Sequence, residues 1–149
     1  MSTEPNQVKW VGIRLAAGET SIPVTLVTTY YTIVEEFVAD GAIAKYDTVY
    51  ISASGKVAKT SASVESTMPV IGIANEAAAD GETFEVLLMG TITNDAWTWT
   101  PKAVLFASTT SGTLTETPPS ASGNIVQRVA RAISATKILV NPSLEYIEV

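Results

Sequence analysis

From Trp10 onward, short runs of branched apolar residues alternate with Thr, Ser, Gly and Asp-Gly along the chain. The segments VKWVGIRL, SIPVTLVTTYYTIVEEFVA and VIGIA have this character. Val, Ile, Thr and Tyr favour strands because their side chains pack well on a pleated surface. After Tyr30-Tyr31, the run IVEEFV also permits a helical turn, but its β-branched residues favour a strand. The pattern predicts an all-β fold.

Two stretches of the chain have a similar sequence pattern and form an internal repeat, one at about 41–92 and one at about 97–149. Val49-Tyr50-Ile51 matches Val104-Leu105-Phe106, Gly55-Lys56-Val57 matches Gly112-Thr113-Leu114, and Ile71-Gly72-Ile73-Ala74 matches Val129-Ala130-Arg131-Ala132. Each unit has the pattern of strand, glycine turn, short strand, Ser/Thr-rich loop and two further strands. Because two units are too few for a solenoid, we expect a duplicated meander. It would form a compact antiparallel sandwich or barrel, with a common core between the facing halves.

The loop NEAAADGE separates two strand-like segments, PVIGIA and TFEVLLMGTI. In the second unit the matching loop is Ile133-Ser134-Ala135-Thr136, which has no acid where Glu76 and Asp80 stand. We therefore interpret NEAAADGE as a connector between two buried strands rather than the lip of an active site. An Asp-Gly turn accounts for Asp80-Gly81.

The chain has the length and the apolar content of one domain with a real core. Its first residues are polar and lack periodicity. We expect a flexible N-terminal arm over residues 1–14, followed by a single β domain over residues 15–149.

The charge argues against a protein that binds phosphates. The net charge is −6 and only 16% of the residues are charged, whereas nucleic-acid binding needs clustered Lys and Arg. Arg128 and Arg131 are close in sequence, but at i and i+3 in a strand they should point to opposite faces. We expect no nucleic-acid partner. A surface this poor in charge is typical of a protein that a partner partly covers.

The sequence offers little for catalysis. It contains no Cys and no His, which excludes thiolate and imidazole chemistry and the common zinc sites. Glu35 and Glu36 are adjacent and cannot act as a pair on a strand, and the acids around Asp80 lack the EF-hand pattern. We expect no catalytic residues, no metal and no cofactor, and therefore no enzyme.

The start of the chain lacks the apolar core of an export signal, and no apolar run is long enough to span a membrane. We therefore expect no membrane partner and synthesis in the cytoplasm.

Trp97 and Trp99 are the most conspicuous aromatic pair. At i and i+2 of an extended segment they share one face. That face can point into the core, fill a groove on a protein partner, or stack on sugar rings. The sequence leaves the three alternatives open.

Most of the chain beyond residue 39 resembles a known family. The runs ADGAIAKYDTVYISASGKVAKTSA and MPVIGIANEAAADGETFEVLLMGTI are similar to the capsid decoration, or cement, proteins of tailed bacteriophages related to lambda-type head decoration proteins. These have a Gly-Ala-Ile start, a viGiA strand and an Ala-x-x-Gly-Glu turn. The C-terminal run, with STTSGTLTETPPS before ATKILVNPS, resembles phage structural proteins. The sequence departs from the family at Tyr46, where Gly is common, and at Arg131.

The resemblance implies a β-tulip-like fold and a structural role in the virion. Such proteins bind the major capsid protein on the exterior of the capsid as homotrimers. They bridge neighbouring capsomers and stabilise the expanded head. The alternative is a head-fibre or tail-appendage component that binds a receptor or glycan. As capsid contacts or oligomer interfaces we expect residues of the arm and exposed aromatic residues, namely Glu4, Val8, Trp10, Tyr30, Tyr31, Trp97 and Trp99.

Overall fold

The computed structural model describes residues 32–149, which form an all-β unit with a short 3-10 turn, η2 (Glu65–Thr67). The strands are β1 (Ile33–Ala39), β2 (Thr48–Ala53), β3 (Lys56–Lys59), β4 (Gly72–Ala74), β5 (Thr83–Thr93), β6 (Val104–Ala107), β7 (Leu114–Thr115), β8 (Ile125–Val126), β9 (Arg128–Ala132), β10 (Lys137–Val140) and β11 (Ile147–Glu148). The strand over IVEEFVA confirms the prediction made from its β-branched residues.

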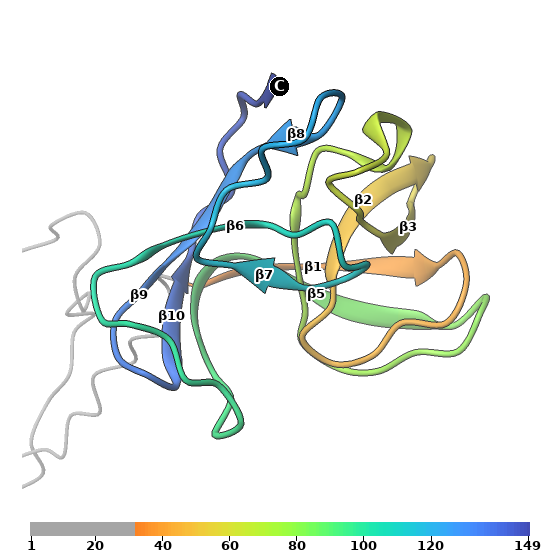
Figure 1. Cartoon of the computed structure of the whole chain (residues 1–149). Helices are drawn as coiled ribbons and strands as arrows, with labels where there is room; N and C mark the ends of the chain where they lie inside the picture. The colour runs from red at the N-terminus through yellow and green to blue at the C-terminus, as the bar shows by residue number, and fades with distance from the viewer. Residues whose placement is uncertain (1–31) are drawn as a thin grey trace, which may run out of the picture. The chain divides into compact units, whose positions relative to one another are not determined.

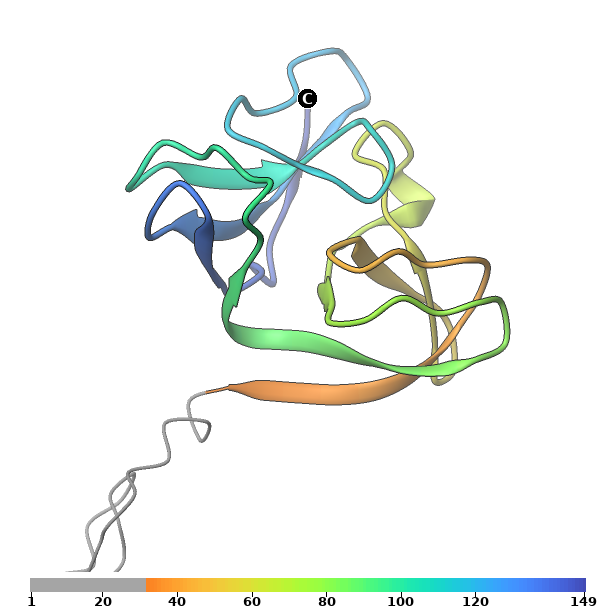
Figure 2. The same cartoon turned by 90° about the horizontal axis from the view of Figure 1, so that it is seen from below.

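The first five strands close into a barrel. They are hydrogen-bonded in the order β1-β3-β2-β4-β5, and β5 pairs again with β1. Figures 1 and 2 show β1 and β5 running side by side along one edge of this barrel. The pairing of β1 with β3 is parallel, so the expected antiparallel arrangement has one exception. The exception arises because β1 closes the barrel between β3 and β5, and five strands in a closed ring cannot all be antiparallel to their neighbours.

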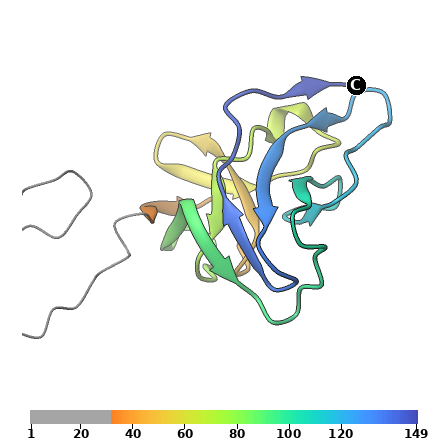
Figure 3. The ribbon, with the colours of Figure 1, turned by 90° about the vertical axis from the view of Figure 1, so that its left-hand side faces the viewer.

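The long strand β5 joins the barrel to a second sheet. Its end, from Gly90 to Thr93, pairs with β10, and the sheet continues in the order β10-β9-β6-β7. Figure 2 shows β5 passing from the barrel into this sheet. Near the C-terminus β8 and β11 form a separate two-stranded sheet, which lies beside the end of the chain in Figure 3.

The duplication predicted from sequence is present in the strand connectivity. The order β3-β2-β4-β5 in the first half is repeated as β7-β6-β9-β10 in the second. One expected match is wrong by a residue: the pairing of Val49 with Gly72 corresponds to that of Leu105 with Ala130. Val49 is therefore equivalent to Leu105 and not to Val104. Both are fully buried, and a slip by one residue would turn every side chain to the opposite face.

A turn of the same type precedes β2 in the first half and β6 in the second. In the first, the Asp47 N–H donates to the Ala44 carbonyl at 3.1 Å, and in the second the Ala103 N–H donates to the Thr100 carbonyl at 3.0 Å. The third residue has a positive φ in each case, 76° at Tyr46 and 75° at Lys102. This position of a type II turn favours Gly, because a side chain there is strained.

Two hydrophobic cores result from this arrangement. One fills the barrel, with Phe84, Val86, Val49 and Val57 among its fully buried members. The other lies between the halves and combines residues of the first, such as Ile73 and Leu87, with residues of the second. It is the common core that the duplicated pattern predicts.

The loop over residues 75–82 connects β4 to β5, as predicted for a connector. Its acids accept hydrogen bonds from backbone N–H groups: Asp80 from Gly41 at 2.8 Å, Glu82 from Ala79 at 2.9 Å, and Glu76 from Glu85 at 3.0 Å. These bonds fix the loop conformation and account for the carboxylates that the sequence places there.

Candidate functional site

An apolar groove of about 540 Å³ opens on the surface where the barrel core ends. Phe37, Ile71 and Leu88 pack against the barrel core and line the inner part of this groove. Its other lining residues come from β1, β2, β5, the segment between η2 and β4, and the segment after β10. They are Ile33, Ile51, Pro69, Val70, Met89, Asn141, Pro142, Ser143 and Leu144. The groove thus extends the apolar interior of the barrel to the solvent.

Several side chains of the apolar groove are unusually exposed. Leu144 is 98% exposed, Ile51 is 55% exposed and Met89 is 39% exposed. Single exposed apolar residues are ordinary, but contiguous ones around a groove mark a surface that binds a partner. The sequence analysis did not select these residues. Leu144 could have been found from its position, because it follows Pro142 in a polar segment outside the predicted strands.

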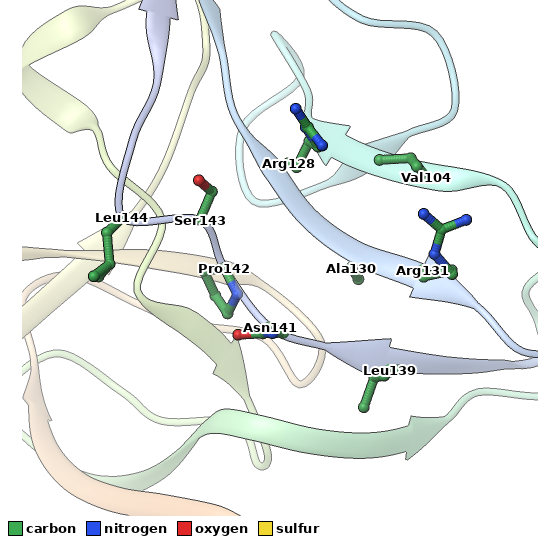
Figure 4. Close-up of a pocket in the computed structure, with 9 residues that line it drawn as sticks. All are labelled: Val104, Arg128, Ala130, Arg131, Leu139, Asn141, Pro142, Ser143 and Leu144. Carbon is green, nitrogen blue, oxygen red and sulfur yellow. The ribbon is translucent and has the colours of Figure 1, made fainter.

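A second groove, of about 520 Å³, shares residues 141–144 with the apolar groove. Figure 4 shows the residues that line it, which are Val104, Arg128, Ala130, Arg131, Leu139, Asn141, Pro142, Ser143 and Leu144. We call it the arginine groove. Since it shares four residues with the apolar groove, the two form one continuous surface.

The two arginines lie on the same face of β9, so the expectation of opposite faces is wrong. The register of β9 against β6 shifts by one residue, because Leu105 pairs with Ala130 and Phe106 with Arg128. This β-bulge places Val129 and Ala130 both in the interior and leaves Arg128 and Arg131 both exposed. A strict alternation of strand faces could not predict it.

The arginine groove has a local positive charge on a chain that is acidic overall. None of its lining residues is acidic. Arg131 donates a hydrogen bond from Nη1 to the Lys102 carbonyl at 2.7 Å, which orients its guanidinium group. Glu145 lines an adjacent smaller groove together with Arg128. The remaining guanidinium donors can bind a carboxylate or another oxyanion.

A third site, the aromatic pocket, has a volume of about 360 Å³. It is lined by Lys45, Tyr46, Asp47, Asn94, Trp97, Trp99, Gly112, Thr113 and Leu114. The ring centroids of Tyr46 and Trp97 are 5.2 Å apart, and those of Trp97 and Trp99 are 6.0 Å apart. These are favourable separations for tilted aromatic pairs. Both tryptophans are half-buried and pack against the core between the halves.

Local hydrogen bonds hold the aromatic residues of this pocket in place. The Asn94 side chain accepts from the Ala96 N–H at 3.0 Å and turns the chain after β5. The backbone N–H of Trp99 donates to the Ala135 carbonyl at 2.9 Å, and the Tyr46 hydroxyl donates to the Thr93 carbonyl at 3.0 Å.

The aromatic pocket includes Asp47, whose carboxyl pKa is perturbed. Burial of its carboxyl group raises the pKa above the ordinary value of 3.8, and a hydrogen bond from the Ala44 N–H and the charge of Lys59 partly offset this. The carboxylate is also confined by Gly112, where a Cβ atom would come within 2.7 Å of it.

The structure brings together only part of the predicted contact set. Trp97 and Trp99 share a face as predicted and meet in the aromatic pocket. The predicted arm and five candidate residues lie outside residues 32–149: Glu4, Val8, Trp10, Tyr30 and Tyr31.

The comparisons with known proteins give one similar structure. No protein-family model matches the chain, and no curated protein matches it. Among solved structures, the chain is similar to one from "The capsid of Myoviridae Phage XM1". The two have 18% sequence identity and a TM-score of 0.49, over 85% of this chain and 94% of that chain.

Within residues 32–149 we find no group of three or more acidic side chains arranged to hold a metal ion. The same part of the chain has no helix with the length and apolar character needed to cross a membrane.

Proposed function

We propose that this chain is a structural protein of a bacteriophage virion that binds the outer surface of the capsid. In this proposal a homotrimer contacts the major capsid protein, bridges neighbouring capsomers and stabilises the expanded head. The sequence motifs at 39–62, 68–92 and 104–149 support the assignment by their resemblance to decoration proteins. The proposal gives the chain no catalytic role.

The observation that carries the proposal is the apolar groove. Ile51, Met89 and Leu144 expose apolar surface next to a groove that reaches the barrel core. Covering this surface would remove it from water and stabilise a complex by about 25 cal/mol for each Å² buried. A protein partner of complementary shape is the occupant that such a surface favours.

The physical effect of such binding requires no chemistry. A protein that binds the assembled lattice more tightly than free subunits adds its binding free energy to the work of separating those subunits. Because several copies in one oligomer bind at once, individually weak contacts are sufficient.

The test is a binding assay with bare expanded heads and with unexpanded shells. We expect the wild-type chain to bind expanded heads, and Ile51→Asp to weaken the binding at least about tenfold because it places a charge in the apolar groove. Ile133→Asp is the matched control: Ile133 is 51% exposed, close to the 55% of Ile51, and lies outside the groove.

Three results would contradict the proposal. The wild-type chain could bind neither kind of head, the two variants could bind equally well, or the chain could bind only a host receptor. The last result would instead favour the head-fibre or tail-appendage alternative.

A further inference from the structure

The aromatic pocket contains a side chain that its own turn does not favour. Tyr46 has a φ of 76°, a conformation that is strained for a residue with a side chain and not for Gly. At the equivalent position of the second half Lys102 has the same conformation, so the turn itself belongs to the scaffold. The large aromatic side chain at Tyr46 is specific to the first half, where it forms one wall of the pocket.

A second feature of the pocket is a donor without an acceptor. The Trp99 indole Nε1 is buried and has no hydrogen-bond partner, although buried polar groups nearly always have one. An unpaired buried donor destabilises the fold. Because this atom is closed to solvent, a ligand oxygen in the pocket could accept its hydrogen bond only after the Trp99 ring shifts.

The polar groups of the pocket come from separate parts of the chain. Lys45 and Asp47 flank Tyr46 in the first turn, Asn94 follows β5, and Thr113 lies before β7. Next to the two tryptophans in sequence, Asn94 and Asp95 carry an amide and a carboxylate. Asn94 lines the pocket but Asp95 does not, and the pocket carboxylate comes from Asp47 instead. Carboxylate, amide and ammonium groups can together bind several hydroxyl groups of one ligand.

We propose that the aromatic pocket is a binding site for a neutral pyranose sugar. A pyranose has an apolar C–H face for an aromatic ring and a rim of hydroxyl groups for Asp47, Asn94 and Lys45. The pocket volume of about 360 Å³ lies at the small end of the range for ligand sites. Because the lining carries charges of both signs, it favours an uncharged sugar over an anionic one.

The affinity of such a site should be low. A single sugar ring has about a dozen non-hydrogen atoms, and a ligand of that size typically binds with a Kd of the order of millimolar. Several copies of the chain on one particle would strengthen attachment to a glycan-coated surface through multivalency. The inference concerns a site separate from the apolar groove and does not depend on capsid attachment.

The experiment is a titration of the full chain with cellobiose and with N,N′-diacetylchitobiose, followed by intrinsic tryptophan fluorescence and by the indole N–H signals in NMR spectra. We expect a saturable change with at least one disaccharide, and shifts of the Trp97 and Trp99 indole signals. Trp97→Ala should weaken binding at least about tenfold.

Two further variants keep the test decisive if Trp97→Ala fails to fold. Asn94→Ala and Lys45→Ala change polar residues of the pocket lining, and each should weaken binding about threefold or more. Tyr146→Ala is the control, since Tyr146 is an exposed aromatic residue outside the pocket, and it should leave binding unchanged. The proposal is overturned if neither disaccharide gives a saturable signal up to about 50 mM, or if the pocket variants bind as well as the wild type.

Discussion

At the scale of single residues, sequence spacing predicts which neighbouring residues of the aromatic pocket share a face, but not which distant residues join them. The i, i+2 spacing of Trp97 and Trp99 predicts that they share a face, and their rings do contact each other. Their partners could not be predicted, because Tyr46 and Asp47 are about fifty positions away and reach the pocket only through the fold. The sequence showed that Tyr46 stands where Gly is common in the similar family, but not that its side chain would form a wall of the pocket.

Asp47 gives a prediction about pH. Its carboxyl pKa is raised by burial, so from pH 3.8 up to the raised value the folded chain holds a proton that the unfolded chain releases. Stability therefore falls as the pH rises through this window. We expect Asp47→Asn to be slightly more stable than the wild type at neutral pH, by no more than about 1 kcal/mol because the half-exposed carboxylate is screened by solvent.

Urea unfolding at about pH 3 and about pH 7 checks this expectation. The advantage of Asp47→Asn should disappear at the lower pH, where the wild-type carboxyl is protonated in both states. Asp95→Asn is the control, because it removes the same charge from an exposed position. An Asp47→Asn advantage that is the same at both pH values would contradict the assignment.

At the scale of elements, sequence repetition predicted the connectivity better than the register. The order of strands and turns in both halves follows from the two echoed units. The equivalence of Val49 with Leu105 was missed by one position because runs of three apolar residues align equally well in neighbouring registers. The bulge in β9 was also missed, since no local residue pattern distinguishes RVARA from a regular strand.

Gly72 in β4 and its equivalent in the second half differ in their tolerance of a side chain. A Cβ atom there would collide with the Leu87 carbonyl oxygen and come within 2.8 Å of Val86 Cγ1. The equivalent residue in β9 is Ala130, which has a Cβ atom and is buried. A Cβ atom thus has room at this position in β9 but not in β4.

We expect Gly72→Ala to lower the free energy of unfolding by at least about 2 kcal/mol, because the collision is with backbone and a buried side chain. The reciprocal variant Ala130→Gly should cost only about 1 kcal/mol, mainly through backbone entropy. Chemical denaturation of both variants measures the difference. Equal losses would show that the barrel imposes no special constraint at Gly72.

At the scale of the whole molecule, the sequence predicted the fold class but left barrel and sandwich open. Closure depends on the pairing of β1 with both β3 and β5, and IVEEFVA carries no signal for either partner. The continuous surface formed by the apolar and arginine grooves was likewise not predictable. It combines residues from the barrel, from the second sheet and from the segment after β10.

The arginine groove predicts how capsid binding should depend on charge. If the proposed capsid contact includes this groove, its partner surface should be acidic and binding should weaken as salt is added. Arg131→Glu should reduce affinity for expanded heads about tenfold and flatten the salt dependence. Lys56→Glu makes the same charge change at an exposed site outside both grooves.

Affinities of both variants and the wild type at low and high salt, measured on the same preparation of heads, test this prediction. Equal loss in the two variants would mean that net charge alone matters and that the groove makes no specific contact.

The position of β1 has a mechanical consequence. The chain enters the described unit at Thr32 and passes at once into β1, which lies antiparallel to β5 over most of its length. A pulling force applied at Thr32 along the axis of β1 would load the β1–β5 ladder in shear. Bonds loaded in this direction share the force and must break together, whereas a force across the strands would open them one at a time. The ladder therefore resists a pull along the strand axis better than a pull across it.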